Sequence, residues 1–396
     1  MRIGIIIDID NVTLLPYLTK EKDKNLVKKH GRMLAAPAVN TLINSFLKAG
    51  HFVRIFTVLN KEFTIKAPQV EVYSIQGYSK YPIKYLWKPF INANRLKHLI
   101  KGKIGDLDVL HAHWTYEFAY AAAHYEKEIP VFCTVRDCAS YIWKIESLKN
   151  KIPWTFNLIM NNMVFRHKNI HFIANSPYTA RMMKIMHNID LPIIPNSIKD
   201  CFIKKDIHIP PKVFKILCIS SSNDKRKNVI SLLKAFRIFK EKHSEACLQL
   251  IGSPFVSGEN KIEKWRKMGL LNGVELMGGI PHDLLTKYID NCSVFVTPSL
   301  EETFGNTILE SIVRKVPVIG GQDSGAVPYV LHNGDAGYLC NVKSPQDLYN
   351  MIDFVYNHPT EAQFKAADAF NIILSEYSED IVCKRHIEIY QSYTNR

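Results

Sequence analysis

Two carboxylates in one short segment are the residues whose types and spacing could do chemistry. Glu302 and Glu310 stand eight positions apart in Pro298–Glu310, whose sequence is PSLEETFGNTILE. The segment follows an apolar run, Val294–Val296, that predicts a buried strand. A carboxylate beside a buried strand is costly to desolvate without partners. Carboxylates accept strong hydrogen bonds from hydroxyl groups, worth about 1.5–3 kcal/mol, so the two acids are candidates for binding hydroxyls.

The residues between the two acids favour a bound anion. A helix is expected from Asn306, a favoured N-cap residue type, to Arg314. Free N–H groups at its start, from Gly305 to Ile308, would form an anion site, and Gly305 would let a phosphate approach the backbone. A phosphate between two sets of hydroxyls describes a nucleoside diphosphate sugar. Spacing alone leaves an alternative open, in which the acids only favour the positive end of the helix.

A basic turn provides a second candidate for phosphate binding. The segment SSSNDKRKN, residues 220–228, lies between an expected strand and an expected helix, and it contains Lys225, Arg226 and Lys227. A diphosphate carries enough charge to hold such a cluster in a cleft. Taken in isolation, the segment fits a solvated basic turn equally well.

Two histidines, His111 and His113, could suggest a metal site at the end of an expected strand. Their side chains are expected to face opposite ways, and no third ligand is evident nearby in the sequence. We therefore expect no metal ion, with His113 lining a cleft and His111 buried in its domain.

The elements that must position these residues alternate between strand and helix. Strands are expected at residues 3–7, 52–58, 70–75, 108–111, 131–135 and 171–174, and again at 215–220, 248–252, 274–277, 293–297, 316–319 and 337–340. Helices are expected between most of them, including 33–49 and 228–243. This alternation predicts an α/β protein with two doubly wound parallel-sheet domains.

The domain boundaries follow from a Pro-rich break between the two series of strands. We expect an N-terminal domain at residues 1–200, a C-terminal domain at 201–377, and an amphipathic C-terminal helix at 378–394. Ligands of such sheets bind at the carboxyl ends of the strands. The expected site is the cleft where the strand ends of the two domains face each other.

Composition limits the class of protein and its partners. The chain has 396 residues, a formal net charge of +14, and eight cysteines without a CxxC pair, which favours free thiols in a reducing compartment. The first ten residues, MRIGIIIDID, predict a strand rather than a signal peptide. Residues 78–103 combine lysines and arginine with aromatic residues and contain no acid. Such a segment suits an anionic membrane surface, although a solvated basic face is the alternative.

Several motifs in order resemble the family-4 retaining glycosyltransferases, which have the GT-B fold. The donor-site signature of that family is similar to TPSLEETFGNTILESIVRKVPVI, residues 297–319. Further likenesses are DVLHAHW at 108–114, IIPNSI at 193–198, NDKRKN at 223–228 and GAVPYVLHNGDAGYL at 325–339. The likeness extends over most of the chain and is strongest from residue 273 to residue 340. It implies that the N-terminal domain binds the acceptor, that the C-terminal domain binds the nucleotide sugar, and that the C-terminal helix packs back on the first domain.

The resemblance implies a role for individual residues. Lys227 corresponds to the lysine that binds the donor diphosphate, Glu302 to the acid that contacts the transferred sugar, and Glu310 to the acid that binds ribose hydroxyls. The backbone N–H groups expected on the diphosphate belong to Phe304, Gly305, Asn306 and Thr307. Gly31 and Arg32 resemble the glycine loop that faces the donor phosphates.

The chain departs from the family pattern at three places. Ser221 and Ser222 replace a Gly-Arg pair, so Arg226 is expected to supply the missing charge. The family often has a His in a Thr-x-His segment after the strand at 131–135. This chain has TVRD instead, so Arg136 or His113 is expected to take over the role of that His. Residues 324–329 replace a Gly-Gly-x-x-Glu loop, which puts one contact to the base in doubt.

The predicted activity is transfer of a sugar from a UDP- or GDP-linked donor to a hydroxyl of a lipid-linked or growing cell-surface glycan. The resemblance implies retention of configuration and no cofactor or metal ion. The protein is expected to be cytoplasmic and peripheral on the inner face of the cell membrane. Alternatives are a GT-B sugar-nucleotide epimerase or phosphorylase and, from another class, a basic nucleic-acid-binding protein. No helix-turn-helix, RNA-recognition or zinc-finger signature supports nucleic acid as a partner.

Overall fold

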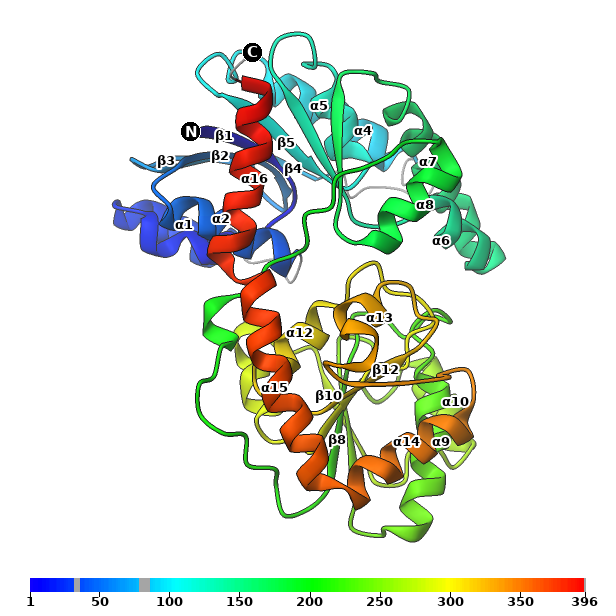
Figure 1. Ribbon diagram of the computed structural model, residues 1–396. Coiled ribbons are helices and arrows are strands. Elements are labelled where there is room, and N and C mark those ends of the chain that lie inside the picture. Colours follow the sequence, from blue (N-terminus) through cyan, green and yellow to red (C-terminus); the bar gives the residue numbers. More distant parts are fainter. Residues whose placement is uncertain (32–35, 78–85, 395–396) are drawn as a thin grey trace. The chain divides into compact units, whose positions relative to one another are not determined.

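The computed structural model describes residues 1–31, 36–77 and 86–394. The chain forms two compact units, one of Met1–Ser197 with Glu379–Arg396 and one of Ile198–Ser378. Each unit contains one sheet with helices packed against it (Figure 1).

Unit 1 contains a seven-stranded sheet in the order β3-β4-β2-β1-β5-β6-β7. Its strands are β1 (Arg2–Ile6), β2 (Phe52–Leu59), β3 (Phe63–Lys66), β4 (Val70–Gln76), β5 (Val109–His113), β6 (Val131–Val135) and β7 (Ile170–Ala174). Its helices are η1 (Asn11–Tyr17), α1 (Glu21–His30), α2 (Pro37–Lys48), α4 (Lys88–Ile100), α5 (Glu117–Ala123), α6 (Ala139–Ile145), α7 (Leu148–Val164), α8 (Pro177–His187) and α16 (Glu379–Thr394).

Unit 2 contains a six-stranded sheet in the order β10-β9-β8-β11-β12-β13. Its strands are β8 (Lys215–Ile219), β9 (Cys247–Ile251), β10 (Val274–Gly278), β11 (Val294–Val296), β12 (Val318–Gly321) and β13 (Tyr338–Cys340). Its helices are η2 (Asp200–Phe202), α9 (Val229–Lys242), α10 (Asn260–Lys267), η3 (His282–Leu284), α11 (Leu285–Ile289), α12 (Asn306–Ile312), α13 (Val327–Val330), η4 (His332–Gly334), α14 (Pro345–Asn357) and α15 (Pro359–Tyr377).

The predicted fold class is confirmed. Each predicted strand is present within two residues of its expected bounds. Strands β1, β2 and β5 pair in parallel, and their apolar residues are buried, as in sheets whose two faces are covered by crossover helices. One strand was not predicted. β3 runs antiparallel to β4 at the edge of the first sheet, and its four residues alternate between buried and exposed.

The predicted helix at residues 33–49 is wrong at its start. The helix begins at Pro37, and Ala36 before it has φ 50° and ψ 47°, in the left-handed region. A helix cannot continue backwards through that conformation, and proline favours the first helical position. Residues 33–35 of the expected helix lie outside the described residues. At the other end, Gly50 follows the helix with φ 80°, as its predicted C′ position requires.

The last helix of the chain, α16, belongs to unit 1 (red in Figure 1). The Tyr390 hydroxyl lies 2.5 Å from Nδ1 of His111 in β5, and both residues are fully buried. At the start of α16, the buried carboxylate of Glu379 accepts a hydrogen bond of 2.8 Å from Lys48 of α2. Residues almost 280 apart in sequence therefore share one core.

Candidate donor-binding site

The strand order of unit 2 explains why two distant loops meet. Counted within the unit, the strands run 3-2-1-4-5-6, so the order reverses between β8 and β11, which pair directly. Loops that leave the carboxyl ends of two such strands diverge and form a crevice in which ligands bind. Lys227 lies in the loop after β8, and Glu302 lies in the loop after β11. The topology therefore places the two predicted residues at the same crevice.

Lys227 and Glu302 form an ion pair in that crevice. Lys227 Nζ lies 2.6 Å from Glu302 Oε1, and the two side chains are only 11% and 16% exposed. Burial raises the pKa of Glu302, but the charges of Lys227 and Arg226 and hydrogen bonds from Lys227 and Ser299 outweigh burial, so the net pKa lies below its usual value. Glu302 is thus held as a carboxylate, the form that accepts hydrogen bonds from hydroxyls.

A second ion pair lies beside the first. The Arg226 guanidinium contacts Oε2 of Glu301 at 3.4 Å and the Asp224 carboxylate at 3.9 Å. The Arg226 carbonyl accepts a hydrogen bond of 2.7 Å from the Leu300 N–H, which ties the two loops together. Glu301 is 3% exposed, and no role was predicted for it. Burial raises the pKa of Glu301, and the charge of Arg226 only partly opposes that effect.

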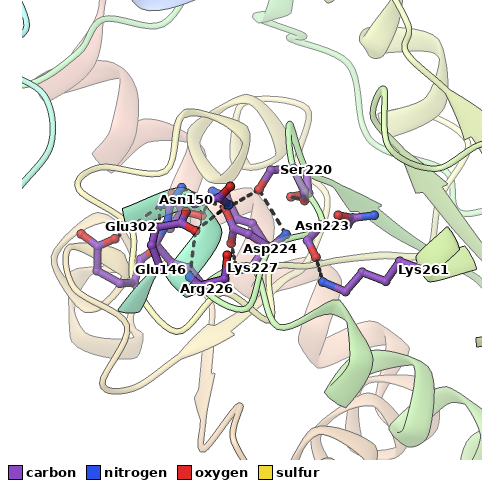
Figure 2. A network of polar contacts seen from close by, with 12 residues as sticks. Glu146, Asn150, Ser220, Asn223, Asp224, Arg226, Lys227, Lys261 and Glu302 are labelled. Atoms are coloured by element: carbon purple, nitrogen blue, oxygen red, sulfur yellow. Dashed lines mark hydrogen bonds and ion pairs between the residues drawn. The ribbon is translucent and has the colours of Figure 1, made fainter. Parts of the chain in front are cut away.

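The basic turn is held by its own polar residues (Figure 2). Asp224 accepts hydrogen bonds from the Lys227 N–H at 3.0 Å and from the Ser222 hydroxyl at 2.6 Å. The ammonium group of Lys261 donates to the Asn223 carbonyl. Ser222, which stands where the family often has arginine, therefore fixes the turn that carries Arg226 and Lys227.

Asn228 links this turn to the rest of the unit. Its amide donates to the carbonyls of Pro298 at 3.0 Å and Val342 at 2.8 Å. Asn228 is 9% exposed and has φ 50°, a left-handed conformation that asparagine tolerates better than most residues. These bonds join the loops after β8, β11 and β13.

Gly325 holds the backbone of Glu302 in place. The Glu302 carbonyl accepts a hydrogen bond of 2.8 Å from the Ala326 N–H, and Glu302 forms a parallel bridge with Gly325. Gly325 has φ 66°, and a Cβ atom there would lie 2.3 Å from the Glu302 carbonyl oxygen. The loop that departs from the family pattern at 324–329 thus supports the acid loop through a position that requires glycine.

The helix after Glu302 differs from its prediction. Gly305, with φ 97°, is the N-cap of α12, and Asn306 is its first residue. The helix ends at Ile312 rather than Arg314. The Ile308 N–H donates to the Gly305 carbonyl at 3.0 Å. The expectation that this N–H group is free to bind an anion is therefore wrong. The glycine is favoured at this N-cap because a side chain is strained at that φ angle.

Glu310 pairs with a histidine that the sequence did not single out. His282 Nε2 lies 2.7 Å from Glu310 Oε1, and the Glu310 side chain is 7% exposed. Glu310 Oε2 is buried and has no hydrogen-bond partner among the residues that the structure describes. His282 comes from η3, after β10, and no local sequence signal relates it to an acid 28 positions later.

The two predicted catalytic residues His113 and Arg136 lie in unit 1. Arg136 Nε donates to His113 Nδ1 at 3.2 Å, and its Nη1 donates to Asn196 Oδ1 at 2.7 Å. His113 Nε2 is buried and unpaired within the described parts of the chain. Burial is the main reason why the pKa of His113 lies well below its usual value, and the charges of the nearby His111 and Arg136 lower it further. Burial also lowers the pKa of Arg136 to about 10.

The expectation that His111 and His113 face opposite ways is wrong. Their ring centroids lie 4.2 Å apart, on one face of β5. Side chains alternate along a strand, so positions two apart share a face. The ring nitrogens of His111 are used by Tyr390 and by the Thr134 hydroxyl at 2.8 Å, so His111 is buried as expected. Among the described residues, no group of three or more His, Cys, Asp and Glu side chains could hold a metal ion.

Gly31 ends α1 instead of directly preceding the next helix. Its N–H donates to Val27 at 2.7 Å, its carbonyl accepts from the Asn11 N–H at 2.9 Å, and a Cβ atom would approach the Val27 carbonyl to 2.8 Å. Arg32 lies outside the described residues.

The basic segment at 78–103 is described only from residue 86 onwards. There, α4 buries Leu96 and Ile100, Trp87 is 52% exposed, and Arg95 donates to the Gln76 carbonyl. In the described part of the chain, no helix is long and apolar enough to cross a membrane.

The chain has two Rossmann-like units, which is the architecture of the GT-B class of enzymes. The ion pairs at the switch point lie in the second of these units. The sequence model of Glycosyltransferase Family 4 matches residues 36–200, and the model described as glycosyl transferases group 1 matches residues 202–369. The chain belongs to the family-4 glycosyltransferases.

Curated relatives are similar over part of their length. The capsular polysaccharide biosynthesis glycosyltransferase CapM of Staphylococcus aureus is 24% identical over 176 residues, which are 43% of this chain and 44% of CapM. The 2-deoxystreptamine N-acetyl-D-glucosaminyltransferase of Niallia circulans is 23% identical over 135 residues, 33% of each protein. The matched region thus spans less than half the length of these relatives.

Solved structures are similar over the whole chain at low identity. Sucrose-phosphate synthase from Thermosynechococcus elongatus has a TM-score of 0.78 at 16% identity, with both chains covered completely. WaaG, a glycosyltransferase involved in lipopolysaccharide biosynthesis, has a TM-score of 0.70 at 13% identity, again with complete coverage. Anabaena HepE in complex with UDP and glucose has a TM-score of 0.69 at 14% identity and covers 98% of this chain and 99% of its own. These similarities establish the shared fold.

Proposed function

We propose that this protein transfers a sugar from a nucleoside diphosphate sugar, UDP- or GDP-linked, to a hydroxyl group of an acceptor. The observation that carries the proposal is the Lys227–Glu302 pair of 2.6 Å at the switch point of unit 2. It puts a cation suited to phosphate beside a carboxylate suited to sugar hydroxyls. The complex of Anabaena HepE with UDP-glucose supports this class of donor.

The proposed donor site uses both cations of the basic turn. An ammonium group has three N–H donors, and Glu302 takes one from Lys227, so donors remain for phosphate oxygens. Arg226 supplies the charge that Ser222 lacks. Backbone N–H groups from Phe304 to Thr307 bind the diphosphate in this scheme, and the role of Gly31 and Arg32 stays a prediction. Glu302 binds the transferred sugar, and Glu310 binds the ribose.

The proposed reaction breaks the bond between the anomeric carbon and the diphosphate and forms a bond between that carbon and the oxygen of the acceptor hydroxyl. Negative charge grows on the leaving phosphate, where Lys227 and Arg226 stabilise it, so no metal ion is required. We propose retention of configuration by a front-face route, in which the leaving phosphate takes the proton of the acceptor hydroxyl. His113, neutral because it is buried, and Arg136 act on the sugar or the acceptor in this scheme.

The proposed acceptor is a lipid-linked or growing cell-surface glycan, reached from the inner face of the cell membrane. The capsular polysaccharide role of CapM and the lipopolysaccharide role of WaaG support that class of acceptor. The basic and aromatic segment at 78–103 is the proposed contact with anionic lipid. Pelleting with anionic and with neutral vesicles tests this contact. Arg95→Glu with Lys101→Glu should weaken binding to anionic vesicles, whereas Lys264→Glu with Lys267→Glu, on exposed positions of α10, should not.

The donor is tested by incubating the full chain with radiolabelled UDP- and GDP-sugars, with and without EDTA, and with glycolipid extract as acceptor. We expect transfer from one donor, insensitivity to EDTA, and an anomeric configuration in the product that matches the donor by NMR. Glu302→Gln should abolish transfer. If no nucleotide sugar binds or turns over, the proposed function is wrong.

A further inference from the structure

We infer that His282 is a positioning residue that holds the Glu310 carboxylate for the ribose hydroxyls of the donor. This inference rests on the proposed function and adds to it a residue outside the acid segment. It is carried by the His282–Glu310 contact, the burial of the acid and the unpaired state of its second oxygen.

The contact joins segments that follow different strands. His282 begins η3, after β10, while Glu310 lies within α12, after β11. His282 Nε2 lies 2.7 Å from Glu310 Oε1, a normal distance for a charge-assisted hydrogen bond. A bond from another segment fixes which oxygen points in which direction.

The histidine ring is itself held in place. The Phe202 ring lies on it with a centroid distance of 4.8 Å and an angle of 39° between the planes. Phe202 is fully buried, whereas the His282 side chain is 27% exposed. The ring is therefore supported on its protein side and can be reached from solvent on the other.

The second oxygen of Glu310 indicates what the pair is for. Glu310 Oε2 is buried without a hydrogen-bond partner among the described residues. A buried acceptor without a donor has lost its hydration without compensation, and such groups are rare in folded proteins. A carboxylate that accepts one bond from the protein and keeps one oxygen unpaired suits a ligand that brings hydroxyl donors. His282, which is partly exposed, marks the side from which such a ligand reaches the pair.

The inference is tested by nucleotide binding rather than by turnover. Isothermal titration of the full chain with UDP, GDP and their 2′,3′-dideoxy analogues separates contacts to the ribose from all others. His282→Ala should weaken binding of the natural nucleotide on the order of tenfold and leave binding of the dideoxy analogue unchanged. His282→Gln, whose amide nitrogen can occupy the position of Nε2, should restore most of the affinity.

A matched histidine–glutamate pair in unit 2 provides the control. His332 Nε2 lies 3.5 Å from Glu376, and the two side chains are 25% and 38% exposed. His332→Asn suits the φ angle of 46° at that position and should leave binding of both nucleotides unchanged. An equal loss of affinity for the natural and the dideoxy nucleotide in His282→Ala would overturn the positioning role. Failure of the unaltered protein to bind UDP and GDP would instead overturn the proposed function, and the inference with it.

Discussion

Lys227 Nζ and Glu302 Oε1 lie 2.6 Å apart although the residues are 75 positions apart in the chain. Both side chains are largely buried, and each is the nearest opposite charge for the other. Such a pair has two roles, since it contributes donors and acceptors to the site and also neutralises charge inside unit 2. Replacing one partner therefore affects folding as well as chemistry.

We predict that Lys227→Met and Glu302→Gln separate these two roles. Each single change leaves one buried charge unpaired. Breaking a buried ion pair costs roughly 3–5 kcal/mol, and we expect each variant to lose stability near the lower end of that range. The double variant removes both charges and should regain most of the stability, but not the sugar transfer. Urea unfolding followed by circular dichroism, with a transfer assay at a temperature where all variants are folded, provides the measurement. Additive losses of stability would show that the pair has no mutual role.

Gly325→Ala is predicted to disturb the acid loop through its backbone. A Cβ atom at this position would meet the Glu302 carbonyl oxygen at 2.3 Å, in addition to the strain of φ 66°. Gly269 provides the control, because it has φ 67° and no atom within 4 Å of its added Cβ. We expect Gly325→Ala to lose transfer activity and to be less stable than Gly269→Ala, which carries only the backbone strain of about 1 kcal/mol. The same activity and melting temperature in both variants would contradict the role of Gly325.

Asp8 is predicted to make the stability of unit 1 depend on pH. Burial raises the pKa of its carboxyl group to about 7. The hydrogen bond of 2.9 Å from the Val58 N–H lowers the pKa, but its effect is smaller than that of burial. An unfolded aspartate has a pKa of about 3.9, so the folded state binds the extra proton between these values. The contribution of Asp8 to the stability of unit 1 should therefore be greatest below pH 4 and should fall as the pH rises towards 7.

Asp8→Asn removes that dependence and keeps an acceptor for Val58. The variant should gain stability over the unaltered protein at pH 8, and less at pH 5, in urea titrations followed by tryptophan fluorescence, which reports mainly on unit 1. Asp106 provides the control, because hydrogen bonds from Arg54 and then Arg2 hold its pKa far below the usual value. Asp106 is ionised at both pH values, so Asp106→Asn should change stability equally at pH 5 and pH 8. A pH-independent effect of Asp8→Asn would refute the prediction.

Local patterns predicted the sheets well and predicted the caps and edge elements poorly. The strands of both sheets were found because an apolar run bounded by polar residues is a local signal. The helix α1 was missed because its sequence, EKDKNLVKKH, contains a single buried residue, Val27. The edge strand β3 is four residues long and gains its partner only from the fold.

The sequence by itself determined that the protein has two α/β domains. It also determined that Arg226, Lys227 and Glu302 lie in loops at the ends of strands, with Glu310 in the helix that follows. These features depend on neighbours in the chain and on the order of motifs. The tertiary structure alone decided which charges meet. Glu301 pairs with Arg226, and His282 pairs with Glu310, because the paths of the loops after β8, β10 and β11 converge. The burial that gives these pairs their energetic weight arises only when the separate segments pack together.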